Sequence, residues 1–211
     1  QWNGGIWQQL GADIDGEAAS DFSGGSVSIS ADGSTVAIGA NGNDGNGSNS
    51  GHVRVYQWNG GIWQQRADID GEAASDFSGS SVSISADGST VAIGATGNDG
   101  NGSDSGHVRV YQWNGGIWQQ LGADIDGEAE YDGSGRDVSI SADGSTVAIG
   151  ASSPRVYQWN GGTWQQLGSD FGGGASSVSI SADGSTVAIG AVSNVGHVRI
   201  YQWSGSSWRQ L

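Results

Sequence analysis

One stretch, VSISADGSTVAIGA, occurs four times in this chain without a single change. Its copies are Val27–Ala40, Val82–Ala95, Val138–Ala151 and Val178–Ala191. In each copy, Val and Ile first alternate with Ser, which is typical of a strand with one buried face. The Asp-Gly pair then predicts a tight turn, and the apolar run Val-Ala-Ile-Gly-Ala predicts a second, inner strand. Four identical hairpins at long, regular spacing indicate a repeat architecture.

Two further strands are expected in each repeat. His52–Trp58 predicts a third strand with Val53 and Val55 facing inward. The motif Trp-Gln-Gln, first seen at Trp7, predicts a fourth strand after an Asn-Gly turn. Four short strands per unit of about 45–55 residues are typical of β-propeller blades. A β-solenoid is the rival architecture, but its coils are usually shorter than this period.

The repeats divide one domain, residues 1–211, into four units and a partial fifth. Their bounds are 1–56, 57–111, 112–157, 158–201 and 202–211. The Trp-Gln-Gln type of strand occurs in all five, so either Gly5–Leu10 or Ser207–Leu211 is surplus to four blades. We therefore expect an all-β fold, a β-propeller of four four-stranded blades or part of a larger propeller, with one surplus strand. An unpaired strand templates pairing with another chain, so we expect the surplus strand to pair with a neighbouring copy, head to tail in a homopolymer, or with further blades of a longer protein.

Composition narrows the class of protein. Forty Gly would suit a disordered chain, but ten Trp and five Tyr supply large apolar area in every repeat and favour order. The net charge of −15, with seven Arg and no Lys, argues against nucleic acid and anionic membranes as partners. The absence of Cys excludes disulfides, and no apolar run approaches the roughly 18 residues that a membrane span needs. Because Gln1 lies inside a repeat, we expect a processed or partial product.

Three motifs carry a resemblance to a known family. Phe22-Ser-Gly-Gly-Ser-Val, Val36-Ala-Ile-Gly-Ala and Gly51-His-Val-Arg-Val-Tyr resemble the FG-GAP repeat of integrin-α-like β-propellers. The resemblance covers all four units, with Phe171-Gly172 as the Phe-Gly pair of the fourth. It implies a propeller at the cell surface or outside the cell, with a protein or glycan partner on the cell surface or in the matrix. That family's calcium loop lies where this chain has its tight Asp-Gly turn, so the loop is not carried over.

A different acidic loop precedes the repeated hairpin in three units. Its carboxylates stand at positions 1, 3, 5 and 9, a spacing that wraps a hard cation such as Ca²⁺. Its glycine stands at position 4, whereas calcium loops turn at a glycine in position 6, so a solvated acidic turn also explains the pattern. The candidate Ca²⁺ ligands are Asp13, Asp15, Glu17, Asp21, Asp68, Asp70, Glu72, Asp76, Asp124, Asp126, Glu128 and Asp132.

Histidine and arginine each recur at one repeat position. His52, His107 and His197 share the first, but a single repeated histidine without a clustered partner does not indicate zinc or a catalytic triad. Arginine recurs two positions later, for example at Arg54, and is expected to face the acidic loops or solvent.

The tryptophan pairs and two asparagines are weaker signals. Pairs such as Trp2 and Trp7 either pack between sheets or form stacking platforms for sugars. Asn46 and Asn101 begin N-x-S sequons, which arise often by chance in such a chain.

The residues that break the repeat are few, so no enzymatic site is predicted. Three functions stay open: an extracellular FG-GAP-like propeller for adhesion or a matrix role that binds Ca²⁺, a subunit of a head-to-tail extracellular filament, and a carbohydrate-binding propeller.

Overall fold

The computed structural model describes residues 1–192 and 195–211, which form strands and turns without a helix. The first nine strands are β1 Ser26–Ile29, β2 Thr35–Ala40, β3 His52–Trp58, β4 Trp63–Asp70, β5 Ser78–Ile84, β6 Thr90–Ala95, β7 His107–Trp113, β8 Trp118–Gln120 and β9 Ile125–Asp126. The remaining strands are β10 Asp137–Ile140, β11 Thr146–Gly150, β12 Arg155–Trp159, β13 Trp164–Gln166, β14 Ser177–Ile180, β15 Thr186–Ala191, β16 His197–Trp203 and β17 Trp208–Gln210.

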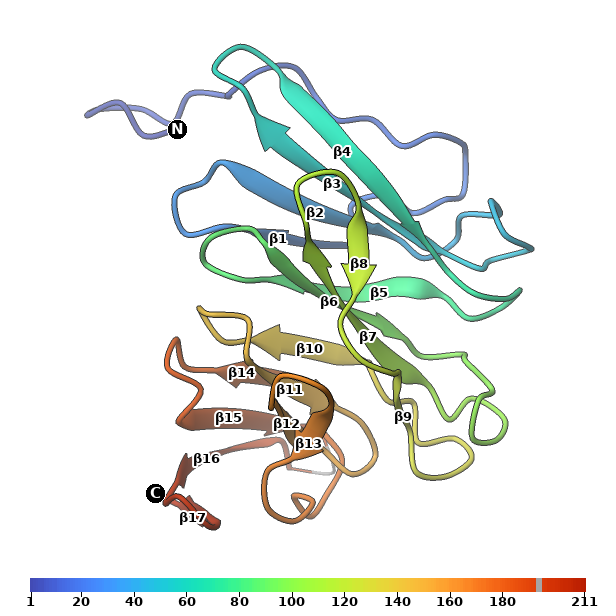
Figure 1. The fold of residues 1–211 in the computed structure, drawn as a ribbon, viewed down its shortest axis with the longest axis vertical. Helices are drawn as coiled ribbons and strands as arrows, with labels where there is room; N and C mark the ends of the chain where they lie inside the picture. Colours follow the sequence, from blue (N-terminus) through green and yellow to red (C-terminus); the bar gives the residue numbers. More distant parts are fainter. Residues whose placement is uncertain (193–194) are drawn as a thin grey trace.

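The strands form four antiparallel sheets, and in each of them four strands follow chain order; the fourth strand comes from the start of the next repeat unit. The sheets are β1–β4, β5–β8, β10–β13 and β14–β17, called here blades 1 to 4, and β9 adds a further pairing to β7 in blade 2. The blades succeed one another from the N-terminal to the C-terminal end without closing into a ring (Figure 1). This confirms the predicted class, four four-stranded blades of a β-propeller.

The repeated hairpin forms for the reason its sequence indicates. Val27 pairs with Ile38 and Ile29 with Val36, in the register that the Asp-Gly turn sets. Asp32 in the turn accepts hydrogen bonds from the Ser30 hydroxyl and the Ser34 amide at 2.7 and 2.9 Å. These bonds stabilise the turn from within.

Serines of each first strand join neighbouring blades. The amides of Val82 and Ile84 in blade 2 each donate to a blade 1 serine hydroxyl, at 3.0 Å. The next two junctions repeat this pattern, with Asp137 replacing the serine that binds the Val178 amide. The polar face of VSIS, which the alternation predicts to face water, therefore holds the blades together.

The cores lie between blades. Val53 and Val55 of blade 1 pack with Val82 and Ile84 of blade 2, and equivalent clusters fill the next two junctions. The glycine of VAIGA permits this approach: a Cβ on Gly94 would collide with a backbone oxygen of the loop that enters blade 3. Alternating apolar residues thus bury their side chains against the next unit.

One core prediction is wrong at the first blade. The alternation in Val-Ser-Ile-Ser predicts that Ile29 and its repeats are buried, but Ile29 is 58% exposed, whereas Ile84 at the same position of blade 2 is 7% exposed. Val36 is half-buried for the same reason. No preceding blade covers this face of β1 in the described residues, so the sequence motif does not itself decide burial.

The surplus strand is the N-terminal one. Residues of Ser207–Leu211 complete blade 4 as β17, and Gly5–Leu10 is left outside the four sheets (Figure 1). The N-terminal segment folds on itself through a Trp2–Trp7 bridge. It also touches blade 1, where the Trp63 indole donates to the Leu10 carbonyl at 2.8 Å.

Phe171 corrects one detail of the FG-GAP alignment. It was matched to Phe22, which is exposed, but Phe171 is buried and packs against Tyr201 and Trp208. In the core between blades 3 and 4, Phe171 has the position that Ile125 has in the core between blades 2 and 3. The sequence is consistent with this, because Phe171 follows Asp170 as Ile125 follows Asp124.

Candidate functional site

The carboxylates of each acidic loop reach different partners. In the first loop, Asp21 accepts from the Ala18 amide and from the Asn43 side chain, while Glu17 faces β3. Asp13 accepts from the Gln9 side chain. Among the described residues, no single loop gathers three of its own carboxylates within ligand distance of one another.

The second and third acidic segments are partly strands. Asp68 and Asp70 belong to β4, and Asp126 belongs to β9, so the expected loop is shorter than its sequence suggests. Asp76 accepts from the Ala73 amide at 2.9 Å, as Asp21 does from its own loop. In the second segment, Asp68 and Asp70 are therefore strand residues, and Asp76 closes a turn.

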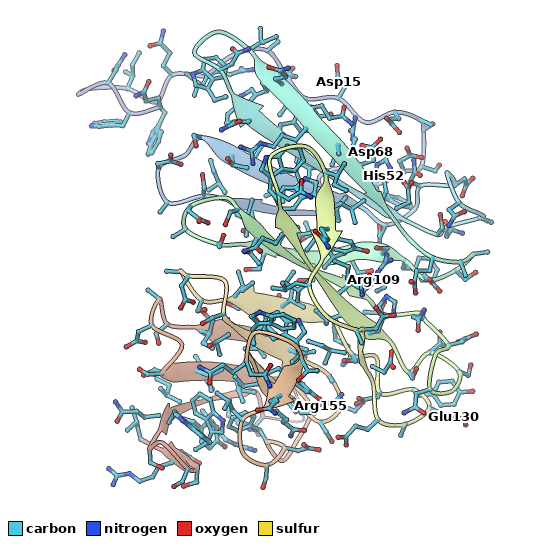
Figure 2. All side chains as sticks on the ribbon, viewed as in Figure 1. Asp15, His52, Asp68, Arg109, Glu130 and Arg155 are labelled. Atoms are coloured by element: carbon cyan, nitrogen blue, oxygen red, sulfur yellow. The ribbon has the colours of Figure 1, made fainter. Side chains whose placement is uncertain are left out.

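Three of the repeated arginines, Arg54, Arg109 and Arg155, lie buried beneath these acidic segments. Arg109 donates to the Asp70 carbonyl at 2.7 Å and lies 3.4 Å from a Glu72 oxygen. Arg155 is 1% exposed and lies 2.6 Å from Asp132 and 3.3 Å from Glu128 (Figure 2 labels both arginines). The prediction that these arginines face the acidic loops is correct for Arg109 and Arg155. Each guanidinium ties the loop before a blade to that blade's third strand.

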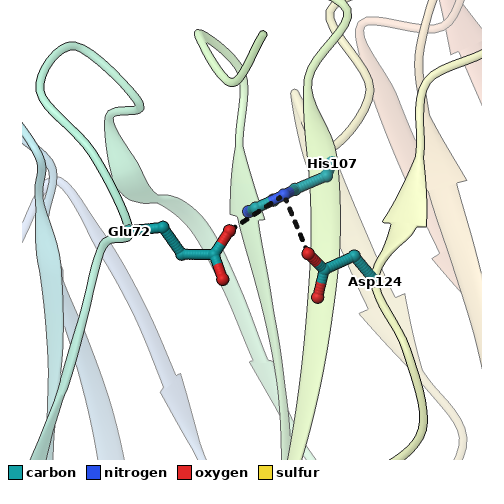
Figure 3. Close-up of side chains that lie close together, drawn as sticks. All are labelled: Glu72, His107 and Asp124. Carbon is teal, nitrogen blue, oxygen red and sulfur yellow. Dashed lines mark ion pairs between the residues drawn. The ribbon is translucent and has the colours of Figure 1, made fainter. Parts of the chain in front are cut away.

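One group of titratable side chains does converge, in blade 2. Glu72 follows β4, His107 begins β7 and Asp124 lies between β8 and β9. His107 Nδ1 lies 3.7 Å from Asp124 Oδ2 and 4.0 Å from Glu72 Oε2, and the three ligand atoms lie within 4.8 Å of one another. Figure 3 shows the two carboxylates approaching the imidazole from different segments. We call these three residues the blade 2 triad.

The imidazole of the triad is buried and unsatisfied. His107 is 1% exposed, and neither of its ring nitrogens has a hydrogen-bond partner among the residues that the structure describes. Burial, and next the charge of Arg109, lowers the pKa of His107 and favours the neutral ring. Asp124 and Glu72 are partly exposed and oppose that shift.

The other carboxylate oxygens of the triad are held by the protein. Gln120 donates to Asp124 Oδ1 at 2.5 Å, and Arg109 lies beside Glu72 Oε1. Each carboxylate thus uses one oxygen for a neighbouring side chain and turns the second towards His107.

Blade 1 does not assemble the same group. His52 lies 4.0 Å from Glu17, but Asp68 pairs opposite Arg54 inside the continuous strand β4. The sequences differ here by one residue: Leu121-Gly122 precedes Ala-Asp in blade 2, and a single Arg66 does so in blade 1. In the third unit, Ser153 occupies the histidine's place.

The tryptophans form cross-strand pairs at the outer hairpins. Trp58 pairs with Trp63 and Trp113 with Trp118, each with ring centroids 5.4 Å apart. A hollow lined by Trp58, Trp113, Arg66 and several polar side chains opens between the two hairpins, with the Arg66 guanidinium 5.0 Å from a Trp113 ring.

The two end blades expose apolar faces that the inner blades bury. Blade 1 exposes Val27 and Ile29 on β1. Blade 4 exposes Val198 and Ile200 on β16; Val198 is 69% exposed, whereas its equivalent Val108 is fully buried. Inside the chain, equivalent faces of neighbouring blades pack against each other in three cores; here we call each exposed face an open junction half.

Sequence reasoning named Glu72 and Asp124 as candidate ligands but set His107 aside. The histidine seemed unclustered because its two acidic neighbours come from separate segments, one before and one after β7. One feature of the sequence indicates the difference between the blades: the link before Asp124 in blade 2 is one residue longer than the link before Asp68 in blade 1.

Comparison with known proteins supports the fold. The sequence model of the FG-GAP repeat family matches residues 12–56 and 63–111. No curated protein matches the chain in sequence.

No helix in the part of the chain that the structure describes could cross a membrane.

Many solved structures resemble the chain, among them two propeller-like proteins. Hydrazine synthase of Kuenenia stuttgartiensis has a TM-score of 0.59 at 16% identity, over 97% of this chain and 53% of that one. TolB of Acinetobacter baumannii has a TM-score of 0.56 at 17% identity, over 90% of this chain and 43% of that one. The chain thus spans about half the length of either structure, and the likeness concerns the propeller fold alone.

Proposed function

Because the chain is built from FG-GAP repeats, we propose that it is a non-enzymatic adhesive and structural module outside the cell, which assembles head to tail. The observation that carries the proposal is the pair of open junction halves, β1 of blade 1 and β16 of blade 4. FG-GAP repeats are typical of extracellular proteins, and the net charge of −15 suits a highly soluble secreted module.

The two open faces are complementary in more than hydrophobicity. At each internal junction, amides of the following first strand donate to serines of the preceding one. Blade 1 therefore offers the amides of Val27 and Ile29, and blade 4 offers the hydroxyls of Ser177 and Ser179. A contact between two different faces is heterologous, so each added copy leaves another open face. Successive copies therefore form a closed ring if their rotation brings the last copy back to the first, and a filament if it does not.

The N-terminal hairpin defines the register of that contact. Leu10 accepts from the Trp63 indole as Leu121 and Leu167 accept from the corresponding indoles of blades 3 and 4. The segment 1–10 thus stands where a preceding blade would place its outer hairpin. Because hairpin 202–211 completes blade 4 of a neighbouring copy, the two hairpins compete for this place in an assembly, and one of them has to move.

Sedimentation of designed variants tests the assembly. Ile200→Asp places a charge on the open face of blade 4, and Ile117→Asp places one on an equally apolar, exposed outer hairpin. We expect concentration-dependent oligomers for the unmodified chain and for Ile117→Asp, and monomers for Ile200→Asp. Electron microscopy then separates filaments from rings. A chain that remains monomeric at high concentration contradicts the proposal.

Calcium binding by the acidic loops remains a proposal with its own test. Up to three Ca²⁺ sites are expected, one for each loop, and the fourth unit, which has Asp170 alone in that region, is expected to contribute none. Bound Ca²⁺ should raise the melting temperature, and EDTA should reverse the rise, because a ligand stabilises the state that binds it. Unchanged melting in EDTA, with no heat on titrating Ca²⁺, rules the sites out.

The hollow beside Trp113 favours carbohydrate binding as a second candidate function. An aromatic ring, a cation and several glutamine amides line it, which matches the stacking and hydrogen-bonding needs of a sugar. A glycan array tests this, with Trp113→Ala expected to abolish any signal and Trp203→Ala, in the equivalent pair of blade 4, expected to retain it.

A further inference from the structure

We propose that the blade 2 triad, Glu72, His107 and Asp124, is a binding site for a divalent transition-metal ion, with Zn²⁺ as the ion of best fit. The site is separate from the assembly proposal. It shares Glu72 and Asp124 with the calcium proposal but differs from it by adding an imidazole and by joining carboxylates from two different acidic segments.

The geometry meets the basic requirement of such a site. Zn²⁺ binds nitrogen and oxygen at about 2.0–2.2 Å, so neighbouring tetrahedral ligands lie roughly 3.3–3.6 Å apart. The Nδ1 to carboxylate distances of 3.7 and 4.0 Å lie slightly beyond that value. Small rotations of the partly exposed Glu72 and Asp124 side chains close the gap. Three protein ligands leave the fourth position open to water or another ligand.

The buried imidazole points to a ligand independently of the acidic cluster. Buried polar groups in folded proteins nearly always have partners, and an exception requires an explanation such as an ion. His107 has two unpartnered nitrogens and directs Nδ1 at two carboxylate oxygens. A bound cation satisfies Nδ1 and both oxygens together.

The donor set favours a transition metal over Ca²⁺. Calcium takes six to eight oxygen ligands, and neutral imidazole suits Zn²⁺ and its neighbours in the first transition row. Two carboxylates and one neutral imidazole balance the charge of a divalent ion. Outer partners are also in place, since Gln120 and Arg109 hold the remaining carboxylate oxygens.

The chain offers a matched control for every ligand. Blade 1 carries His52, Glu17 and Asp68 at the same repeat positions, but Asp68 pairs opposite Arg54 in β4. Isothermal titration of the chelator-treated full chain with Zn²⁺ should therefore show one site. Asp124→Asn should weaken it by at least about tenfold, as losing a ligand costs no less than losing an outer partner. Asp68→Asn should leave it unchanged.

Two further measurements sharpen the test. His107→Gln should abolish binding, and Co²⁺ in place of Zn²⁺ should give visible absorption that is lost in this variant. Replacing Arg66 by Leu-Gly reproduces the blade 2 sequence in blade 1 and should raise the stoichiometry from one Zn²⁺ to two.

The outcomes that overturn the proposal are distinct. They are an absence of Zn²⁺ binding, binding that survives His107→Gln, or equal losses in Asp124→Asn and Asp68→Asn. If His107→Gln does not fold by near-ultraviolet circular dichroism, Asp124→Asn decides, because its side chain is partly exposed.

Discussion

Ile29 and Ile84 provide a test of how much stability the contact between blades contributes. Both lie in the same Val-Ser-Ile-Ser sequence, and both begin a hairpin of the same register. Ile84 packs in the core between blades 1 and 2, whereas Ile29 faces away from any described neighbour. Truncation to alanine therefore removes the same atoms from two environments.

The expected magnitudes follow from burial. Ile→Ala removes three carbons, each worth about 0.8 kcal/mol when fully buried, so Ile84→Ala loses about 2.4 kcal/mol before any cavity term. The cavity brings the loss into the range of about 2–5 kcal/mol. Ile29 is 58% exposed, and the removed atoms leave no enclosed space, so Ile29→Ala should cost about 1 kcal/mol or less.

Urea unfolding monitored by circular dichroism gives the comparison. The two variants should differ by at least about 1 kcal/mol, and by roughly 2–4 °C in melting temperature for each kcal/mol at this chain length. The measurement is made in dilute solution, where copies do not associate, because a second copy would bury Ile29. Equal losses in the two variants would refute the assignment of the core to the space between blades.

Three other substitutions test single contacts. Arg155→Ala leaves the carboxylate of Asp132 buried and unpaired and should cost about 3–5 kcal/mol by urea unfolding, with Arg199→Ala, on a partly exposed residue, as the smaller control. Hydrogen bonds from the Ser181 side chain and then from Ser185 lower the pKa of Asp183 from 3.8 to about 2. The stabilisation that they give is therefore complete above about pH 4 and lost towards pH 2; acid unfolding of Asp183→Asn should show a smaller fall across that window. Gly94→Ala should lower the melting temperature because its Cβ collides with the backbone of the next blade; an unchanged value would mean that the junction is looser than the structure shows.

Most of the fold within a blade is readable from local sequence. Alternating Val and Ile predict β1, the Asp-Gly pair predicts its turn, and Trp-Gln-Gln predicts the outer strand, because each signal acts over a few residues. The four-stranded order follows directly, since consecutive antiparallel strands joined by short turns become neighbours.

The environment of each blade is not readable in the same way. The hairpins of blades 1 and 2 are identical in sequence, yet the first leaves Ile29 exposed and the second buries Ile84. The difference is that blade 1 packs against Ile84, whereas no described blade packs against Ile29. Phe171 shows the same effect, because its sequence neighbour Gly172 suggested an FG motif and its packing partners show a core residue.

The blade 2 triad extends this argument to chemistry. The repeat gives the blades nearly the same side chains, and the blades differ in the length of the links between their strands. One residue fewer before Asp68 keeps β4 continuous and places that aspartate opposite Arg54 in the β3–β4 ladder, whereas the longer link before Asp124 ends β8 and brings the carboxylate to His107. Near-identical segments thus give a ladder position in one blade and a converging ligand set in the next. In a chain of near-identical units, individual sites are therefore to be sought where the links change length, since the strands themselves are constrained to repeat.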